Sequence, residues 1–479
     1  MNTPEKSIAL NKSENPLYFF QPAGAWFPLL SYIFLTAALL GMGGVGSKIL
    51  NVVFPIGAAA IGCLLYFRYP IIYVSFTWWL FFLSPLIRRI ADFRGGAFVD
   101  PSTILLAPYL AVLFCLHTLY ENLPKTHKQG TFPFILALCG ILYGYLVGLA
   151  NDKPIAVTLI CLKWVAPVLF GYYLLINWRN YPAYRQTIQR TFLWGVLISG
   201  IYGVYQFQVA PDWDRLWLVS TKMTSAGSPE PLGIRVWSTM NSPGTFSHMM
   251  MAGLLILFSC TSFMRFPAAG FGYLSFLLTL VRTGWIGWII SLATMSTSMQ
   301  PKLRNRLIIT VLVLAICVVP LTTIEPFSKV ISDRVGTLAD IKNDGSAIAR
   351  QGLYTRKIDS ALDSVLGDGF GGVGYDSALL NCLFQLGWIG TIPYLGGMVI
   401  LILSILKISV IQSDSFANIS RAIAISSFIF LTAGSAMIEL GGMILWGFMS
   451  IAIMADRYHQ HQNKLSTQDR SKLLTISTN

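Results

Sequence analysis

The composition and the hydropathy of the sequence predict an all-α, polytopic transmembrane bundle of about 12 to 14 helices. Only 11% of the 479 residues are Asp, Glu, Lys or Arg, whereas 54% are hydrophobic. An ordinary soluble protein carries about 25% charged residues. The mean hydropathy of +0.61 is spread over nearly the whole length. Because such a chain cannot cover itself with polar surface, most of its helix faces need lipid around them.

Windows of about 20 residues divide the chain into apolar segments that are separated by shorter polar ones. Seven predicted spans precede the first long polar segment, at 26–43, 51–67, 70–87, 102–120, 131–149, 156–176 and 190–207. Seven more follow, at 246–264, 268–281, 283–298, 306–323, 386–406, 420–438 and 440–455. The pair at 268–298 is close to the minimum spanning length, which is why the expected number is a range.

The distribution of Lys and Arg orients these spans, because cytoplasmic loops carry an excess of both. If the helices alternate, one side receives Lys125, Lys128, Arg179, Arg185, Arg190, Lys302, Arg304, Arg306, Arg457, Lys464, Arg470 and Lys472. We expect that side to be the cytoplasm, so both termini are cytoplasmic and the chain is a multi-pass protein of the cytoplasmic (inner) membrane. The first 24 residues lack the basic-then-apolar order of a cleavable signal, so the first helix is expected to stay in the membrane.

This orientation divides the chain into tails, helical regions and two outer loops. A large outer loop is expected to contain short helices, including an amphipathic one near 355–366. The expected regions are a cytoplasmic tail at 1–24, transmembrane helices at 25–207, an outer loop at 208–245, transmembrane helices with an Arg282 hairpin at 246–323, a large outer loop at 324–380, transmembrane helices at 381–456 and a cytoplasmic tail at 457–479.

The charge balance and the cysteines argue against several classes of function. The net charge of +13 falls in short runs between apolar segments, which membrane topology explains better than nucleic-acid binding does. The seven cysteines lie in or beside apolar segments and form no CxxC pair, so we interpret them as small hydrophobic residues. We therefore expect no nucleic-acid partner, no metal and no cofactor.

Arginines on the expected outer side oppose the usual charge bias and need individual explanations. Surface pairing and binding of an anionic ligand are both open for most of them: Arg88, Arg89, Arg94, Arg215, Arg235, Arg334, Arg350 and Arg356. Arg282 differs because it lies between two apolar runs in Leu278–Trp285, where a guanidinium needs a cavity, an acid or a phosphate. Arg235 precedes a helix expected to begin near Thr245, and a helix N-terminus beside an arginine suits an anion.

Titratable groups near the second outer loop supply candidates for proton transfer. Asp376 follows the glycine cluster Gly367–Gly374 and is a candidate general base for a hydroxyl and a candidate N-cap of the next helix, two roles that do not exclude each other. The glycines are expected to let the backbone turn sharply and come close to a substrate or to another helix. Glu439, expected at the outward end of a helix and paired with an Arg, and His248 are weaker candidates.

Three segments together resemble the O-antigen ligase and O-antigen (exopolysaccharide) polymerase family of bacterial polytopic membrane proteins. They are Arg235–Gly244, with its Asn-Ser-Pro before a helix; Leu278–Trp285, with its Thr-Leu-x-Arg hairpin; and 350–390, which ends in Leu-Gly-Trp-Ile-Gly. The resemblance covers roughly 190–410. It implies transfer of a glycan from a polyprenyl pyrophosphate carrier to a sugar hydroxyl at the outer membrane face, without a nucleotide-sugar donor or an obligatory metal.

One departure from the family bears on the reaction. Many members carry a His-Asn pair after the glycine cluster, where this sequence has Tyr375-Asp376-Ser377. Asp376 in place of that His favours a polymerase of lipid-linked repeat units over a ligase that uses a lipid acceptor. The resemblance further implies membrane lipids and a chain-length regulator or a flippase as candidate partners.

In the mechanism expected from these residues, Arg235 and Arg282 bind the pyrophosphate and stabilise its departure, and Asp376 deprotonates the acceptor hydroxyl. Arg350, Arg356, Arg88, Arg89 and Arg215 are further substrate-binding candidates. A polytopic transporter or lipid flippase is the rival function, although the unusual charges gather toward the outer helix ends rather than mid-membrane. A purely structural scaffold is a third reading, and it leaves Arg282 unexplained.

Overall fold

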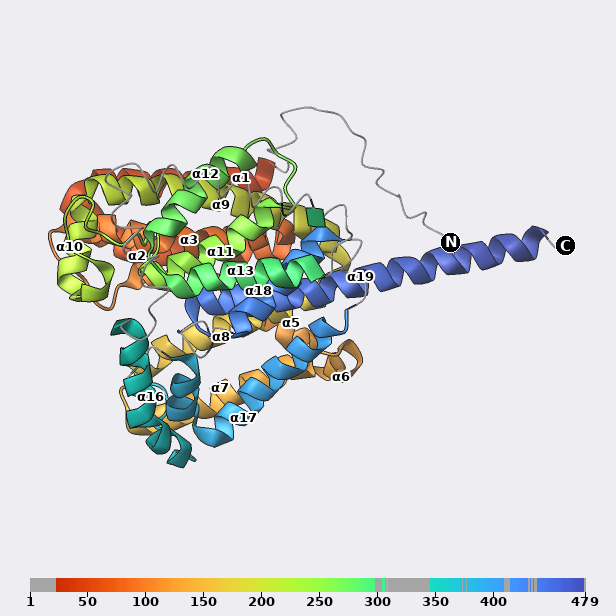
Figure 1. Ribbon diagram of the computed structural model, residues 1–479. Helices are drawn as coiled ribbons and strands as arrows, with labels where there is room; N and C mark the ends of the chain where they lie inside the picture. The colour runs from red at the N-terminus through yellow and green to blue at the C-terminus, as the bar shows by residue number, and fades with distance from the viewer. Residues whose placement is uncertain are drawn as a thin grey trace.

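The computed structural model is a bundle of long helices (Figure 1). It describes residues 23–297, 304, 305, 308, 345–372, 374, 375, 377–408, 414–429, 431, 434 and 437–477. Within these ranges nine helices are long and apolar enough to cross a membrane. The predicted all-α, multi-pass architecture is confirmed.

The first part of the chain runs back and forth through the bundle. Its elements are α1 (Ala23–Gly41), α2 (Gly43–Arg68), α3 (Pro70–Gly95), η2 (Thr103–Leu106), α4 (Ala107–Leu113), α5 (Cys115–Asn122), η3 (Leu123–Lys125), α6 (Thr126–Gln129), α7 (Phe132–Asn151), α8 (Pro154–Ile176), η4 (Trp178–Asn180) and α9 (Tyr181–Val209). The short pieces from η2 to η3 together make one apolar crossing, at Thr103–Lys125.

Among the described residues, the second part adds two more helices long and apolar enough to cross a membrane, together with shorter helices. Its elements are α10 (Asp212–Thr221), η5 (Thr224–Ala226), α11 (Pro243–Leu257), α12 (Arg265–Leu278), α13 (Arg282–Thr297), α16 (Gly345–Asp363), α17 (Ala378–Leu406), α18 (Ser415–Ile429) and α19 (Glu439–Ser477). The predicted span at 306–323, the predicted tail up to residue 22, and Arg334 lie outside the described residues, apart from residue 308 in that span.

The two ends of the bundle differ. The loop end carries α10 and α16, and the tail end is the one beyond which α19 projects (Figure 1). Proline lies in the first turn of several helices, where an N–H has no helical partner, and serine side chains cap α11 and α17. At α11, Ser242 Oγ accepts a hydrogen bond from the Thr245 amide at 3.1 Å, and Pro243 follows the cap.

Helices pair closely where glycine faces a neighbouring backbone. α17 packs along α7, α19 along α8, and α12 along α9. A Cβ at Gly171 of α8 would stand 2.9 Å from the Trp446 carbonyl oxygen of α19. Small residues allow this approach in a membrane, where helices associate by packing rather than by the hydrophobic effect.

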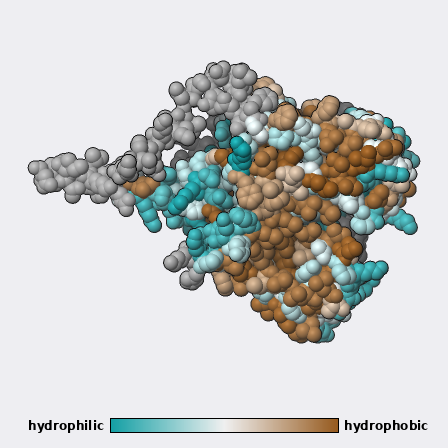
Figure 2. Space-filling view, turned by 180° about the vertical axis from the view of Figure 1, so that it is seen from behind, coloured by the Kyte–Doolittle hydropathy of each residue, from teal (hydrophilic) through white to brown (hydrophobic). Residues whose placement is uncertain are grey.

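The outer surface of the bundle is apolar over its middle. Hydrophobic side chains predominate there, with hydrophilic ones toward the two ends (Figure 2). Phe34 and Ile56, near the middle of α1 and α2, are large exposed residues of this kind. A soluble protein rarely exposes so broad an apolar face, so the surface is the one that lipid covers.

At the tail end, Asp414 joins three helices. Its carboxylate caps α18 by accepting from the Phe416 and Ala417 amides at 3.0 and 3.2 Å. It also accepts from Tyr181 of α9 at 2.8 Å and lies 3.1 Å from His459 of α19. Burial alone would raise the pKa of Asp414, but its hydrogen-bond and charged partners, His459 first among them, lower it below the usual value.

Several predicted boundaries differ from the observed ones. α17 begins eight residues before the predicted start at 386, because Ser377 caps it and the chain continues through a kink at Gly387. The helix predicted for 420–438 is α18, which begins at Ser415 and ends at Ile429. α19 continues as a helix to Ser477, through the segment expected to be a solvated tail. Helical hydrogen bonds are internal, so a helix need not end where it leaves the membrane.

Candidate functional site

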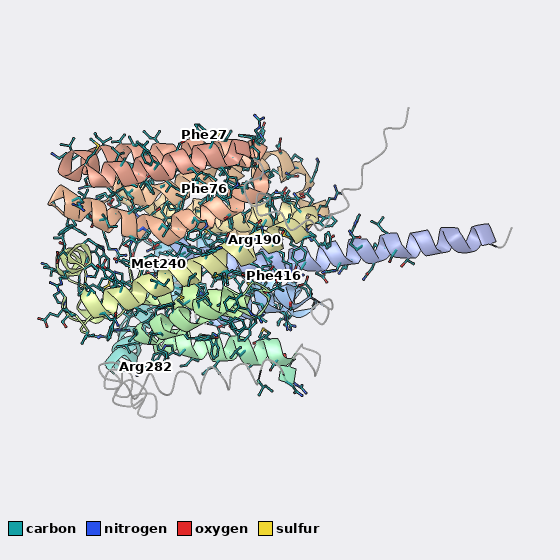
Figure 3. All side chains as sticks on the ribbon, turned by 90° about the horizontal axis from the view of Figure 1, so that it is seen from above. Phe27, Phe76, Arg190, Met240, Arg282 and Phe416 are labelled. Atoms are coloured by element: carbon teal, nitrogen blue, oxygen red, sulfur yellow. The ribbon has the colours of Figure 1, made fainter. Side chains whose placement is uncertain are left out.

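The turn between α12 and α13 places Arg282 at the loop end, on the side of the bundle away from the projecting end of α19 (Figure 3). Thr279 stabilises the turn: its hydroxyl donates to the Phe276 carbonyl at 2.7 Å and accepts from the Val281 amide at 3.2 Å. Leu280 has a positive φ of 55°. The reversal is tight, and it starts α13 directly at Arg282. The partial positive charge of a helix N-terminus therefore adds to the guanidinium.

Arg235 joins the segment 208–245 to this turn. Its guanidinium donates to the carbonyl oxygens of Thr279 at 3.2 Å, Leu280 at 3.1 Å and Ser225 at 2.6 Å. The Val236 amide donates to the Leu278 carbonyl at 3.0 Å. The structure thus brings Arg235 and the Arg282 turn together. Through these bonds Arg235 positions the turn.

A buried ion pair supports the same segment from behind. Arg89 of α3 and Asp214 of α10 meet at 2.7 Å, and both side chains are 0% exposed. Tyr202 and Gln206 of α9 each donate to Asp214 at 2.8 Å. Burial raises the pKa of Asp214, while Arg89 opposes that rise.

The network continues into the backbone just after Arg235. Arg89 donates to the Ser238 carbonyl, and the Gln206 side-chain oxygen accepts from the Trp237 and Ser238 amides at 3.0 and 2.8 Å. Ser238 itself has a positive φ of 50°. These bonds satisfy the polar backbone of a segment that is buried although it is not helical.

Three further arginines among the substrate-binding candidates have partners within the protein. Arg88 pairs with Asp92 at 2.8 Å and lies 4.4 Å from the centre of the Phe98 ring. Arg215 lies 3.8 Å from Asp212 at an exposed position. Arg88 and Arg89 are thus both paired with an aspartate of the protein. Because both arginines are also buried, their role is structural.

The glycine cluster, which joins α16 to α17, lies against α7. The Phe370 amide donates to the Gly144 carbonyl at 3.1 Å, and a Cβ at Gly369 would overlap the Gly148 backbone. Gly367 similarly approaches Gly387, and both have positive φ. The expected sharp turn and close approach are therefore present, and what the cluster approaches is a neighbouring helix.

Other candidates at this end have different outcomes. Asp376 lies outside the described residues, and Ser377 is the N-cap of α17, so the N-cap alternative for Asp376 is wrong. Arg356 is exposed on α16 and donates to the Gly352 carbonyl at 2.9 Å. Arg350 belongs to the same helix, although its side chain lies outside the description. α16 is attached to α17 through the Tyr354 hydroxyl, 2.6 Å from Ser377 Oγ.

The two weaker titratable candidates both have partners on other helices. Glu439 pairs with Lys163 of α8 at 2.7 Å, so its expected partnership with an arginine is wrong. His248 of α11 lies 2.7 Å from the Ser427 hydroxyl of α18. Next to it, α11 and α13 touch so closely that a Cβ at Gly284 would overlap Ser247 Oγ. His248 thus holds helices together beside the Arg282 turn.

Sequence reasoning missed Lys163 and Asp214. Lys163 is the tenth residue of α8, about 14 Å along the helix from its start, yet its side chain is 39% exposed and that of Glu439 38% exposed. Its signal was a single charge inside an apolar run. This pair also corrects the expectation that the unusual charges gather only toward the helix ends. Asp214 carried no such signal, because acidic residues in a loop are common.

The arrangement at the loop end can bind an anion. Arg282 stands at a helix N-terminus on a turn that Arg235 holds, and buried polar contacts make its support rigid.

In the part of the chain that the structure describes, no group of three His, Cys, Asp or Glu side chains could hold a metal ion. Comparison with protein-family models, curated proteins and solved structures finds no match.

Proposed function

We propose that this chain is a polymerase of lipid-linked oligosaccharide repeats at the outer face of the cytoplasmic membrane. The observation that carries the proposal is the placement of Arg282 at the start of α13, on a turn held by the Arg235 guanidinium. A cationic helix start at one end of a multi-pass bundle suits a phosphate group on a lipid carrier. The segment resemblance supplies the class of reaction.

In the proposed reaction an acceptor sugar hydroxyl attacks the anomeric carbon of a glycan linked to polyprenyl pyrophosphate. The new glycosidic C–O bond forms as the bond to the pyrophosphate oxygen breaks. The hydroxyl proton passes to a carboxylate, for which Asp376 is the candidate, and the lipid pyrophosphate leaves. Arg282 and the α13 N-terminus stabilise the negative charge that develops on the leaving group.

The remaining residues of the proposal act by positioning. Arg235 keeps the turn in one conformation, and the pair of Arg89 with Asp214 keeps the Arg235 segment in place. Arg356 and Arg350 of α16 remain substrate-binding candidates. Because a lipid carrier confines both reactants to the membrane surface, a fixed site there reduces the entropic cost of their encounter.

The test is the glycan profile of cells that lack the protein and are complemented with wild type, Arg282→Ala, Arg282→Lys or Asp376→Ala at matched membrane levels. We expect wild type alone to convert accumulated single repeats fully into polymer, and the lysine variant to restore only part, because it lacks the guanidinium fork. Arg94→Ala is the matched control, since Arg94 is exposed at the same end of the bundle. Full polymer with Arg282→Ala would refute the site.

A ligase is the alternative within the same chemistry, and the acceptor distinguishes the two. Loss of polymer attachment to a lipid acceptor, with chain length unchanged, would identify the ligase. Both readings place the donor at the Arg282 turn.

A transporter or lipid flippase is a second candidate, which the Lys163 and Glu439 pair favours. Charges inside spanning helices are costly and line pathways for ions or polar substrates. A normal glycan profile in the deletion strain, together with loss of solute or lipid transport that Lys163→Met cannot restore, would establish this candidate and overturn glycosyl transfer.

A further inference from the structure

A basic pocket opens at the tail end, far from the Arg282 turn. It has a volume of about 530 Å³ and lies between the segment before α7, the end of α8 and the projecting part of α19. Small-molecule sites in proteins typically measure about 300 to 1,000 Å³. The pocket is therefore large enough for a phosphate-bearing headgroup.

Three basic residues line one wall of the pocket. Arg457, His461 and Lys464 all come from α19. Their spacing of four and then three residues places them on a single face of the helix. Among the described residues that line the pocket, none is acidic. Charge of one sign on one face, inside a concavity, concentrates anions.

Two acidic side chains on α19 or in contact with it do not line the pocket. Asp456 accepts from the side chain of Gln460, a lining residue, at 2.7 Å, and Asp414 accepts from His459, which points to a different side of α19. On the opposite wall Gly130 leaves room for Arg457: a Cβ there would stand 3.0 Å from its Nη2 atom. Arg457 is thus held at the pocket by the shape of its surroundings.

The third wall of the pocket is apolar and lies where a spanning helix ends. Leu175 and Ile176 are the last apolar residues of α8, and Trp178 follows them with its ring centre 5.4 Å from that of His461. Tryptophan is enriched at the boundary between lipid and water. An apolar wall beside basic side chains at that depth matches a lipid, which carries its acyl chains and its phosphate side by side.

We propose that this pocket binds the phosphate headgroup of an anionic lipid from the leaflet at the tail end. Basic pockets between transmembrane helices are known to take such headgroups. Arg457 and Lys464 bind the phosphate oxygens, Trp178 lies at the interface, and the acyl chains run along α8. The lipid joins α19 to α8 and to the segment before α7. This inference is independent of the proposed reaction.

The experiment compares two double variants of the purified full chain. Arg457→Gln/Lys464→Gln removes two charges from the pocket, whereas Lys125→Gln/Lys407→Gln removes two from exposed positions at the same end. Retention of phosphatidylglycerol or phosphatidylcholine is measured by native mass spectrometry, and the thermal midpoint is measured in mixed micelles of each lipid. A parallel series adds inorganic phosphate at millimolar concentration.

We expect phosphatidylglycerol to raise the thermal midpoint of wild type, and its apparent affinity to fall roughly tenfold or more in the pocket variant. The control variant should stay within about twofold of wild type, and phosphatidylcholine should have no effect. An equal loss in both double variants would overturn the proposal, because it indicates diffuse attraction. Inorganic phosphate that stabilises wild type as well as the lipid does would instead identify a soluble phosphate site.

The single variant Lys464→Gln guards against misfolding. Lys464 is exposed at the rim of the pocket, so its substitution leaves the packing of α19 intact. If the double variant does not give folded protein, Lys464→Gln should still weaken phosphatidylglycerol retention by roughly threefold or more. Unchanged retention in that variant would count against the pocket.

Discussion

Replacing Arg89 by Met is expected to loosen the loop end more than any surface change there. The substitution keeps an unbranched, though shorter, side chain and removes the charge from a position that is 0% exposed. Asp214 then keeps only two of its donors, Tyr202 and Gln206. The Ser238 carbonyl also loses its bond from Arg89.

The structure sets the size of this effect. Removing one partner of a buried ion pair costs about 3 to 5 kcal/mol, and the two remaining donors place Arg89→Met near the lower limit. Asp214→Leu leaves the Arg89 guanidinium with the Ser238 carbonyl as its acceptor, so its cost should lie near the upper limit of this range. The double variant removes both charges but leaves two donors without their acceptor, at about 1 to 3 kcal/mol. The double variant should therefore cost less than the two single ones together.

Acidity provides a second signature of the same pair. Burial raises the pKa of Asp214 above its usual value of 3.8, and the loss of Arg89 raises it further. When a carboxyl group has a higher pKa in the folded state than in the unfolded state, the folded protein loses stability as the pH rises from the unfolded-state pKa to the folded-state pKa. The deficit of Arg89→Met relative to wild type should accordingly be smallest below pH 3.8 and grow towards neutral pH.

The assay is unfolding of wild type and the three variants in mixed detergent micelles, followed by helical circular dichroism across a pH series. A deficit of less than about 1 kcal/mol for both single variants would refute the role of a buried pair. Strict additivity in the double variant would refute the coupling of the two side chains.

The other predictions concern helix contacts elsewhere. Gly284→Ala should cost about 1 to 3 kcal/mol in unfolding, because the new methyl group overlaps Ser247 Oγ and overpacking forces both helices apart; wild-type stability would contradict that contact. Lys163→Met should lower the free energy of unfolding by about 1 kcal/mol, because each side chain of its pair with Glu439 is more than a third exposed and therefore screened. Adding Glu439→Gln in a double-mutant cycle should reduce this loss of stability. Asp414→Asn should cost about 1 to 2 kcal/mol at neutral pH. Because its partners lower the pKa of Asp414, this stabilisation is present above pH 3.8 and should vanish as the pH falls below it; a difference independent of pH would contradict the assignment.

Predictions from the sequence succeeded where they depended on local composition. The spans predicted at 131–149 and 156–176 correspond to α7 at Phe132–Asn151 and α8 at Pro154–Ile176. Each is an unbroken apolar run between polar residues, and the hydropathy of such a run is a property of the run alone. The boundaries failed where helices extend beyond lipid, as in α9, which begins at Tyr181 rather than 190.

The candidate site could be predicted only in part. The Thr-Leu-x-Arg hairpin and the position of Arg282 were readable from the alternation of apolar and polar residues. The role of Arg235 was not, because its three acceptors are carbonyl oxygens, which every residue possesses. Nothing in a sequence shows which carbonyl a guanidinium will reach.

Composition and hydropathy were enough to predict a chain with few charges, with helices of spanning length and with lipid around most of its surface, because the free energy of transfer into a membrane sums over neighbouring residues. Which charges meet could be learned only from the fold. Arg89 of α3 pairs with Asp214 of α10, and Lys163 of α8 pairs with Glu439 of the neighbouring α19. Those pairings depend on which helix faces come together, and a charge in an apolar bundle has few polar neighbours, so packing rather than local pattern selects its partner.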